Sequence, residues 1–477
     1  MLKPEEIKAF IERDEASDKK RAAKVGVDYY EARHDIRNYR VFFVNADGVL
    51  QEDKTKSNIK ISHPFFTENV DQVVQYLLSG KDGFVKSDDP ELQAVLDAYF
   101  NDNEDFMAEL YDTMTGCVAK GFENMYAYKN EEGKTAFQCA DSIGVVEVKK
   151  SLTDDGCEYV IYWYKEHDRD NKEIRRIQVW NESETHFFCQ VDGGDIEIDK
   201  SEDANPRPHV LFKEGGKTYF ENYGFIPFFR IDNNRKQASG LVPIKALIDD
   251  YDLISCGLSN NIQDTNEALY VVKGFQGDNL DELMVNIKAK KHIGVDEDGA
   301  VEIKTIDIPY QARQTKLDLD EKNIYRFGFA LNTSGLKDTN ATTNLAIKTA
   351  YSLLDLKANK LVIRLKQFMR KLLKVVLAEV NELNGTDYRQ SDVYFDFTFE
   401  VPVNEQENAQ IELTEAQRKQ TEINTLLNLA TYLGNDVLME QVFEQLDLDY
   451  EEYKDKLPSL DDGLTGAENT LNKTEIE

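Results

Sequence analysis

The sequence predicts an α+β fold, in which helices and antiparallel strands occupy separate parts of the chain. Residues 122–229 alternate between apolar and polar side chains, which is the period of half-buried strands. Residues 336–384 contain neither Gly nor Pro, which favours one long helix. Within them one apolar stripe recurs at spacings of four and three, formed by Leu354, Ala358, Leu361, Leu365, Phe368, Leu372 and Val375.

The long helix is predicted over residues 344–384. Thr342 and Thr343 offer N-caps, and Gly385 offers a stop. At about 1.5 Å per residue the helix would span about 60 Å, which exceeds an ordinary compact domain. Such a rod suits an extended protein or an assembly.

The other elements are assigned from their periodicity. A charged helical arm is expected over residues 1–25, with further helices at 27–38, 68–78, 90–101, 105–119, 407–431 and 437–445. Strands are expected at 40–43, 123–128, 135–139, 144–149, 158–164, 174–180, 186–191 and 210–213. A strand at 392–400 is expected to rejoin that sheet, and the polar tail 461–477 to be disordered.

An unusual order of elements precedes the long helix. A helix begins near Ser239, followed by a strand at 269–273 and a helix at 280–288. A hairpin is predicted to pair residues 291–295 with 301–305 around the turn Asp296-Glu297-Asp298-Gly299. A helix at 311–329 then returns, and the polar loop 331–343 leads into the long helix.

Charge and composition exclude several classes of protein. With 57 basic and 89 acidic residues the net charge is −32, which opposes non-specific binding to nucleic acid. We expect neither a signal peptide nor a membrane span, because the N-terminal residues are charged and no apolar run approaches about 18 residues. The five cysteines are scattered, which indicates reduced thiols rather than disulfides or a zinc site.

No catalytic, metal-binding or cofactor-binding motif is found. Gly133-Lys134-Thr135 and Gly216-Lys217-Thr218 imitate a phosphate-binding loop but lack its first glycine, so hairpin turns are expected there. The turn at Asp296 resembles a calcium loop, but Ala300 occupies a ligand position. The six histidines are isolated, and carboxylates are too abundant for any pair to be informative.

One group of charges stands out on the long helix. Eight basic residues oppose a single acid, Asp355: Lys348, Lys357, Lys360, Arg364, Lys366, Arg370, Lys371 and Lys374. The favoured interpretation is a salt-bridged face, with pairing between subunits as its main form. The alternative is contact with nucleic acid.

Four stretches resemble the portal (head-to-tail connector) proteins of tailed double-stranded DNA bacteriophages, of the siphophage type from Gram-positive hosts. They are Ile226-Pro227-Phe228-Phe229, the run from Gly240 to Tyr251, Asn323-Ile324-Tyr325-Arg326-Phe327, and the run from Ala346 to Leu356. Their order over residues 25–455 carries the resemblance more than any single motif does.

The resemblance implies a division of the chain into the parts of a portal subunit. After the arm 1–25 would come an α/β wing (26–238), an antiparallel helical stem (239–267 and 310–330) and a small α/β clip (268–309). The tunnel loop would be 331–343, the long tunnel helix 344–384 and a returning wing strand 385–404. A helical crown (405–457) and a disordered tail (458–477) would follow.

The same resemblance implies a function. Such a protein forms a ring, typically a dodecamer, at one capsid vertex, through which double-stranded DNA is packaged and ejected. Its partners would be terminase large subunit, head-tail adaptor proteins, and major capsid and scaffolding proteins, with no membrane. It would lie in the virion, and in the host cytoplasm during assembly.

The residues expected to meet DNA are Ser334, Lys337, Asn340 and Lys348, and those expected to dock partners are Asp296, Glu297, Asp298 and Gly299. No catalytic residue, metal or cofactor is expected. Two other classes stay open. A metal-dependent nucleic-acid enzyme would cleave in the presence of divalent metal, and a structural adaptor would lack a channel.

Overall fold

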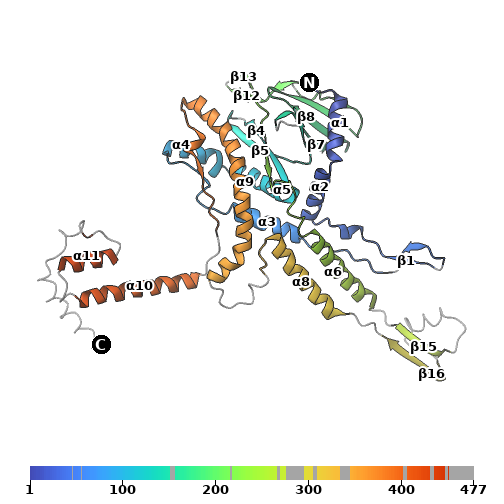
Figure 1. Cartoon of the computed structure of the whole chain (residues 1–477). Coiled ribbons are helices and arrows are strands. Elements are labelled where there is room, and N and C mark those ends of the chain that lie inside the picture. Colours follow the sequence, from blue (N-terminus) through green and yellow to red (C-terminus); the bar gives the residue numbers. More distant parts are fainter. Residues whose placement is uncertain are drawn as a thin grey trace. The chain divides into compact units, whose positions relative to one another are not determined.

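The computed structural model describes residues 1–45, 47–54, 56–130, 132–150, 156–202, 204–214, 217–265, 269–275, 295–304, 309–333, 344–400, 405–429, 435–445 and 450. The chain divides into two compact units, which are described separately. The first comprises Met1–Asp338 with Ala350–Glu400, and the second Thr339–Thr349 with Val401–Glu477. Helices and antiparallel sheets occupy separate stretches (Figure 1), as an α+β fold requires.

Helices dominate the N-terminal part of the first unit. They are α1 (Pro4–Glu15), α2 (Asp18–Tyr30), η1 (Asp35–Asn38), α3 (Phe65–Leu77), α4 (Pro90–Leu96), η2 (Asp97–Asn101) and α5 (Glu104–Lys120). The predicted helix at 27–38 is therefore divided between the end of α2 and the short η1. Gly121 ends α5 with a positive φ of 98°, and a Cβ there would lie 2.4 Å from the carbonyl oxygen of Gln237.

All strands in the described part of the chain pair antiparallel, as predicted. One sheet has the order β14 (Phe228–Asp232), β4 (Phe122–Lys129), β5 (Thr135–Ala140). The larger one runs β10 (Ile196–Ile198), β9 (Glu184–Val191), β8 (Glu173–Trp180), β7 (Cys157–His167), β6 (Val145–Lys149), and β11 (Arg207–Pro208) also pairs with β9. Two separate hairpins are β1 (Phe42–Val44) with β2 (Leu50–Glu52), and β12 (Val210–Glu214) with β13 (Lys217–Glu221). Both sequences that imitate a phosphate-binding loop adjoin hairpin strands.

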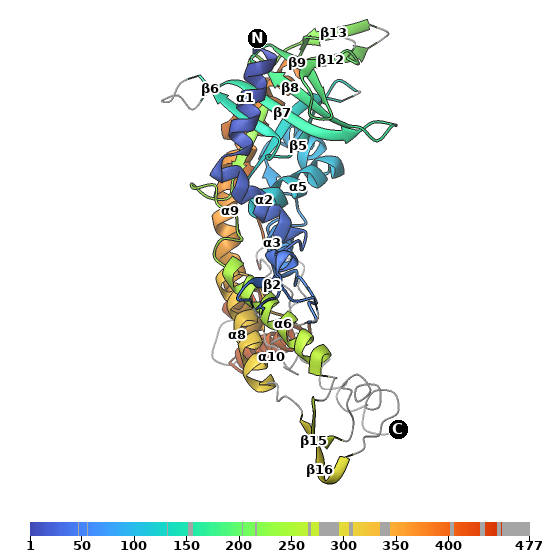
Figure 2. The same ribbon diagram turned by 90° about the vertical axis from the view of Figure 1, so that its right-hand side faces the viewer.

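The N-terminal helix covers the larger sheet (Figure 2). Ile7 and Ile11 of α1 are fully buried against alternate side chains of β6, β7 and β8, among them Val146, Ile161 and Ile177. Alternate residues of the strands and residues four apart on the helix therefore pack together in one hydrophobic core. The charged arm is thus an integral layer of the unit.

A buried lysine attaches α2 to the turn before β6. The Lys20 ammonium donates to the backbone carbonyls of Ser142, Ile143 and Val145, the last at 2.8 Å, and lies 3.1 Å from the Asp14 carboxylate. Burial lowers the pKa of Lys20, although Asp14 opposes that shift. One buried side chain therefore donates to three backbone carbonyl groups of the segment that precedes and begins β6.

The predicted hairpin at 291–305 is wrong. Strand β16 (Val295–Lys304) runs through the expected turn and pairs with β15 (Leu269–Phe275). The register places Lys273 opposite Ala300 and Phe275 opposite Val295, so Asp296, Glu297, Asp298 and Gly299 form a bulge opposite one residue of β15. The helix predicted at 280–288 falls outside the described residues.

Three long helices and one small sheet follow, and all of them lie in the first unit except the start of the last helix, residues 344–349. The helices are α6 (Lys245–Thr265), α8 (Tyr310–Gly328) and α9 (Asn344–Asn384). All seven residues of the predicted stripe on α9 are buried. The expected strand 392–400 is reduced to β17 (Tyr394–Phe395), after η5 (Gln390–Asp392). It pairs with β3 (Val85–Lys86) and does not rejoin the large sheet, which corrects the prediction.

The second unit contains two described helices, α10 (Glu405–Asn428) and α11 (Asn435–Gln445). They agree with the helices predicted there. The predicted disordered tail lies outside the described residues.

We predict that Lys20→Met destabilises the first unit by about 2–3 kcal/mol, because it leaves three carbonyl oxygens without their charged donor. Urea unfolding of the full chain, followed by circular dichroism at fixed chain concentration, measures the change.

The matched control is Lys24→Met on the same helix. Lys24 is 45% exposed and lies 3.8 Å from Glu15, so its loss is expected to cost at most about 0.5 kcal/mol. Equal effects of the two substitutions would contradict the role given to Lys20.

Candidate functional site

The structure places only part of the predicted site. Ser334, Lys337 and Asn340 fall outside the described residues. Lys348 is exposed in the early turns of α9, within the second unit. Asp296, Glu297, Asp298 and Gly299 lie in the bulge of β16. Their expected contacts with DNA and with partner proteins stay predictions.

Helices α6 and α8 form an antiparallel pair (Figure 1). Lys316 of α8 bonds to Asp250 of α6 at 2.5 Å and also to Asp320 on its own helix. One turn earlier on α8, Arg313 reaches Asn261, which is further along α6, at 2.8 and 3.0 Å once the Asn261 amide oxygen faces it. The pair therefore runs in opposite directions, and β15 and β16 follow α6 and precede α8 in the chain.

An irregular segment, residues 57–63, lies along α6 and is here called the strap. Every second residue of the strap donates its backbone N–H to a side chain of α6. The accepting residues are spaced four apart along that helix. The pairs are Ser57 with Asp264 (3.1 Å), Ile59 with Asn260 (2.6 Å), Ile61 with Cys256 Sγ (3.2 Å) and His63 with Asp252 (3.0 Å). Four helical residues rise about 6 Å and two extended residues about 6.6 Å, so the two repeats stay in step.

The inner end of the strap is held by a buried carboxylate. Asp252 accepts from His34 Nδ1 at 2.6 Å and from His63 Nδ1 at 2.7 Å, and neither the His34 nor the Asp252 side chain is exposed. Burial alone would raise the pKa of Asp252, but the hydrogen bonds from both histidines bring it below its usual range. Tyr29 stacks on His34 with ring centroids 4.4 Å apart. Asp252 therefore ties α6 to α2, η1 and the strap together.

Helix α3 holds the chain where it leaves α8. The hydroxyl of Tyr325 donates to Glu68 at 2.5 Å. The Gln72 amide accepts from the Leu331 N–H at 2.9 Å and donates to the Leu331 carbonyl at 3.0 Å. The backbone N–H and carbonyl of Leu331 are thus both hydrogen-bonded where the predicted tunnel loop begins.

Lys357 joins α9 to the end of α8. Its ammonium donates to the Gly328 carbonyl at 2.9 Å, where α8 ends and Phe329 adopts a left-handed conformation. Burial lowers the pKa of Lys357 to about 8. The cation therefore caps a helix C-terminus, where the helix dipole favours positive charge.

The other cations of α9 make few contacts within the chain. Lys360 lies over the Phe329 ring at 5.3 Å and Lys366 over the Phe397 ring at 5.9 Å. Within the described part of the chain, none of the eight basic residues forms an ion pair with a carboxylate. The only acid among them, Asp355, accepts from the Tyr76 hydroxyl. The sequence favoured a salt-bridged face on α9. The described part of the chain supplies no carboxylate that pairs with these eight cations, so salt bridges of this face would need carboxylates from elsewhere.

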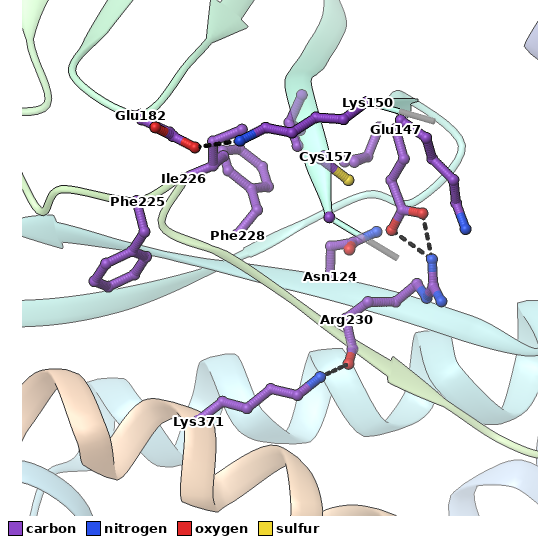
Figure 3. A pocket seen from close by; sticks show the side chains of 14 residues that line it. Asn124, Glu147, Lys150, Cys157, Glu182, Phe225, Ile226, Phe228, Arg230 and Lys371 are labelled. Carbon is purple, nitrogen blue, oxygen red and sulfur yellow. Dashed lines mark hydrogen bonds and ion pairs between the residues drawn. The ribbon is translucent and has the colours of Figure 1, made fainter. Parts of the chain in front are cut away.

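A polar pocket of about 510 Å³ lies where β6 and β14 meet α9 (Figure 3). Arg230 forms an ion pair with Glu147, and Lys371 of α9 donates to the Arg230 carbonyl at 3.4 Å. Burial, followed by repulsion from Arg230, lowers the pKa of Lys371. At the other wall Lys150 bonds to Glu182 at 2.6 Å. The pocket thus joins α9 to the sheets through paired groups.

No metal site, membrane-spanning helix or disulfide is found among the described residues. No group of three or more histidine, cysteine or carboxylate side chains among them is placed to hold a metal ion. None of the described helices has both the length and the hydropathy that a bilayer span needs. The five cysteines are free thiols.

Comparison with known proteins identifies the family. The family model described as "Phage portal protein, SPP1 Gp6-like" matches residues 9–455. The chain belongs to this family of phage portal proteins. The resemblance seen in the sequence is therefore confirmed, including its assignment to phages of Gram-positive hosts.

Two portal proteins show the similarity directly. The chain is 28% identical to the portal protein of Bacillus phage SPP1 over 335 residues, which are 70% of this chain and 65% of that protein. It is 29% identical to the portal protein of Clostridium phage phiCD119 over 178 residues, 36% of this chain and 39% of that protein. The chain thus spans less than two thirds of either relative. A solved structure titled "Neck of native GTA particle computed with C12 symmetry" aligns with 80% of this chain and 89% of its own, at 11% identity and a TM-score of 0.37.

Sequence reasoning missed the strap and its carboxylate. The apolar pattern of this helix predicts a buried face formed by Ile244, Leu247, Ile248, Tyr251, Ile254 and Leu258. Ile244 and Ile248 are buried and the other four are half-buried, whereas Asp252 and Cys256, which were not predicted to lie on that face, are buried. The only signal in the sequence was a set of polar residues spaced four apart on α6. Such a pattern looks the same as a solvent-exposed helix face unless the segment that binds these residues is known.

We predict that Asp252→Asn lowers the free energy of unfolding by about 2–3 kcal/mol at pH 7, because one buried charged acceptor serves two donors, the buried His34 and the half-buried His63. Since the folded-state pKa of Asp252 lies below its usual value of 3.8, this contribution is complete above that pH and is lost as pH falls further. The difference between wild type and variant should therefore be constant from pH 7 to about 5 and shrink below about pH 4. Hydrogen exchange should also accelerate at the His63 and Ile61 amides.

The matched control is Asp264→Asn at the other, half-buried end of the strap, which keeps an oxygen for the Ser57 amide. It should leave both stability and exchange at His63 unchanged. If Asp252→Asn behaves like this control, Asp252 does not hold the strap.

Proposed function

We propose that the chain forms a ring of twelve subunits at one vertex of a phage capsid. Double-stranded DNA would pass through its channel during packaging and ejection. The ring would also dock terminase large subunit and head-tail adaptor proteins, and contact the major capsid and scaffolding proteins. The observation that carries this proposal is membership of the portal family over residues 9–455.

Each part of a portal subunit that the resemblance implies can be assigned to elements of this chain. The sheets with α1–α5 would be the wing, α6 and α8 the stem, and β15 with β16 part of the clip. The predicted tunnel loop, 331–343, would follow the Gln72–Leu331 attachment and lead into α9. Helices α10 and α11 would belong to the crown. The strap would stiffen the stem by binding α6 along much of its length.

Electrostatics suit a channel through which DNA slides. A chain of net charge −32 repels phosphates, so the duplex would stay away from most of the surface. Brief contacts would come from the few basic or small polar residues of the loop, such as Lys337. Tight phosphate binding would oppose movement.

We predict that Lys337→Glu impairs DNA packaging while ring assembly is retained, because it replaces a brief attraction by repulsion at the proposed point of contact. An in vitro packaging assay with purified procapsids measures the first property and native mass the second. Unchanged packaging would remove Lys337 from the proposed contact.

The ring itself is tested by native mass spectrometry of the purified chain. Twelve chains of 54.7 kDa give roughly 660 kDa. A monomer or dimer under all salt conditions would overturn the proposal. Cleavage of DNA by the pure protein in divalent metal would instead favour an enzyme, and a closed assembly without a central hole would favour an adaptor.

A further inference from the structure

Helix α9 carries a second stripe opposite its buried one. Shifting the first six buried positions by two residues, about 200° around the helix, gives the outer face: Leu356, Lys360, Ile363, Gln367, Arg370 and Lys374. The next shifted position, Leu377, is buried, so the outer face ends at Lys374. Leu356 is 53% exposed and Ile363 is 62% exposed. The outer face therefore combines exposed aliphatic side chains with cations at spacings of four and three, a pattern suited to packing against another protein element.

The composition of this face argues against DNA as its main partner. Phosphate oxygens cannot make apolar contacts with Leu356 or Ile363. In a complex with DNA these side chains would remain exposed to water or lie beside charged groups. A protein surface can cover both kinds of side chain. In the described part of the chain Lys360, Arg370 and Lys374 have no carboxylate partner, so the partner has to supply acidic groups.

The same chain carries a surface of the required charge. No lysine or arginine lies between Lys86 and Lys120, whereas this stretch contains nine acids: Asp88, Asp89, Glu91, Asp97, Asp102, Glu104, Asp105, Glu109 and Asp112. Seven of them are exposed, and Asp97 and Glu109 are half-buried. We call this stretch, residues 88–112, the acidic surface.

The contacts made to these acids by other described residues are with neutral groups. Asp89 caps α4, Asp97 accepts from Gln93 and Asn101, and Glu109 accepts from the Cys139 N–H at 2.7 Å. As far as the described residues extend, none of the nine forms an ion pair. Two oppositely charged surfaces of one chain are therefore both without ionic partners.

Their positions suit contact between copies rather than within one. Figure 2 shows α9 along one side of the first unit and α5, which carries part of the acidic surface, on the other. A contact between two different surfaces of identical chains repeats from copy to copy, and it closes into a ring when the rotation allows.

We propose that the outer face of α9 binds the acidic surface of the next copy of this chain. This inference rests on the proposed ring and names the two surfaces that would hold its subunits together. Leu356 and Ile363 would be covered on assembly, while Arg370 and Lys374 would pair with carboxylates around α5. Pairs that are solvated in the free chain would be partly desolvated in the ring, which strengthens their attraction.

The test uses two charge reversals in the full-length chain. Arg370→Glu with Lys374→Glu makes both surfaces acidic, and Asp105→Lys with Asp112→Lys makes both basic. Each variant alone should form at least tenfold fewer rings than wild type in about 0.1 M salt. Mixed together they should restore rings with a strict 1:1 composition by native mass spectrometry, because only alternating contacts are complementary.

The control is Arg235→Glu with Lys236→Glu, which makes the same change in net charge at an exposed loop and should leave assembly unchanged. Circular dichroism of each variant establishes that it is folded, which matters most for Asp105 in the first turn of α5.

Each outcome has a distinct meaning. Rings of wild-type abundance from either reversed variant, or a mixture that does not recover, would overturn the proposed pairing while leaving the ring intact. If the α9 variant forms normal rings but fails to package DNA, the outer face contacts nucleic acid instead. If wild type forms no ring, the proposed function itself fails.

Discussion

The central constraint in this protein is the two-sided character of α9. One side is a continuous apolar stripe that is buried within its own unit, and the opposite side has exposed aliphatic and cationic residues without carboxylate partners among the described residues. In a free chain water solvates these charges. In an assembly the outer side would lose water, so its cations would then need acids from elsewhere. In the proposed ring the helix would therefore connect the folding of one subunit to the association of many.

The rest of the first unit fixes the helices around that rod. Lys357 attaches α9 to the end of α8, Gln72 fixes Leu331, and Asp252 joins α6 to residues more than 180 positions earlier. In each of these contacts a charged or amide side chain forms hydrogen bonds with polar groups of a segment that is distant in the sequence. A family whose proposed task is to hold a channel open while DNA moves needs such fixed geometry.

The sequence predicted what depends on local periodicity. The stripe of α9 and the strands β4–β9 can be predicted from neighbouring residues, and both are confirmed, although burial along these strands does not alternate strictly: the first four residues of β4 are all buried. The hairpin at 291–305 failed because a strong turn signal at Asp296–Gly299 was overridden by pairing with β15, which lies some twenty residues earlier. Asp252 could not be singled out among 89 acidic residues, because its histidine partners are distant in sequence. Family resemblance supplied the proposed function, which no motif indicated.

The most direct test of this account is a cryo-electron microscopy map of the purified oligomer. The account predicts a closed ring with an open central channel, in which Arg370 and Lys374 of each subunit face the acidic surface of its neighbour. A ring whose α9 cations face solvent would contradict the account of assembly. A particle without a channel would contradict the proposed function.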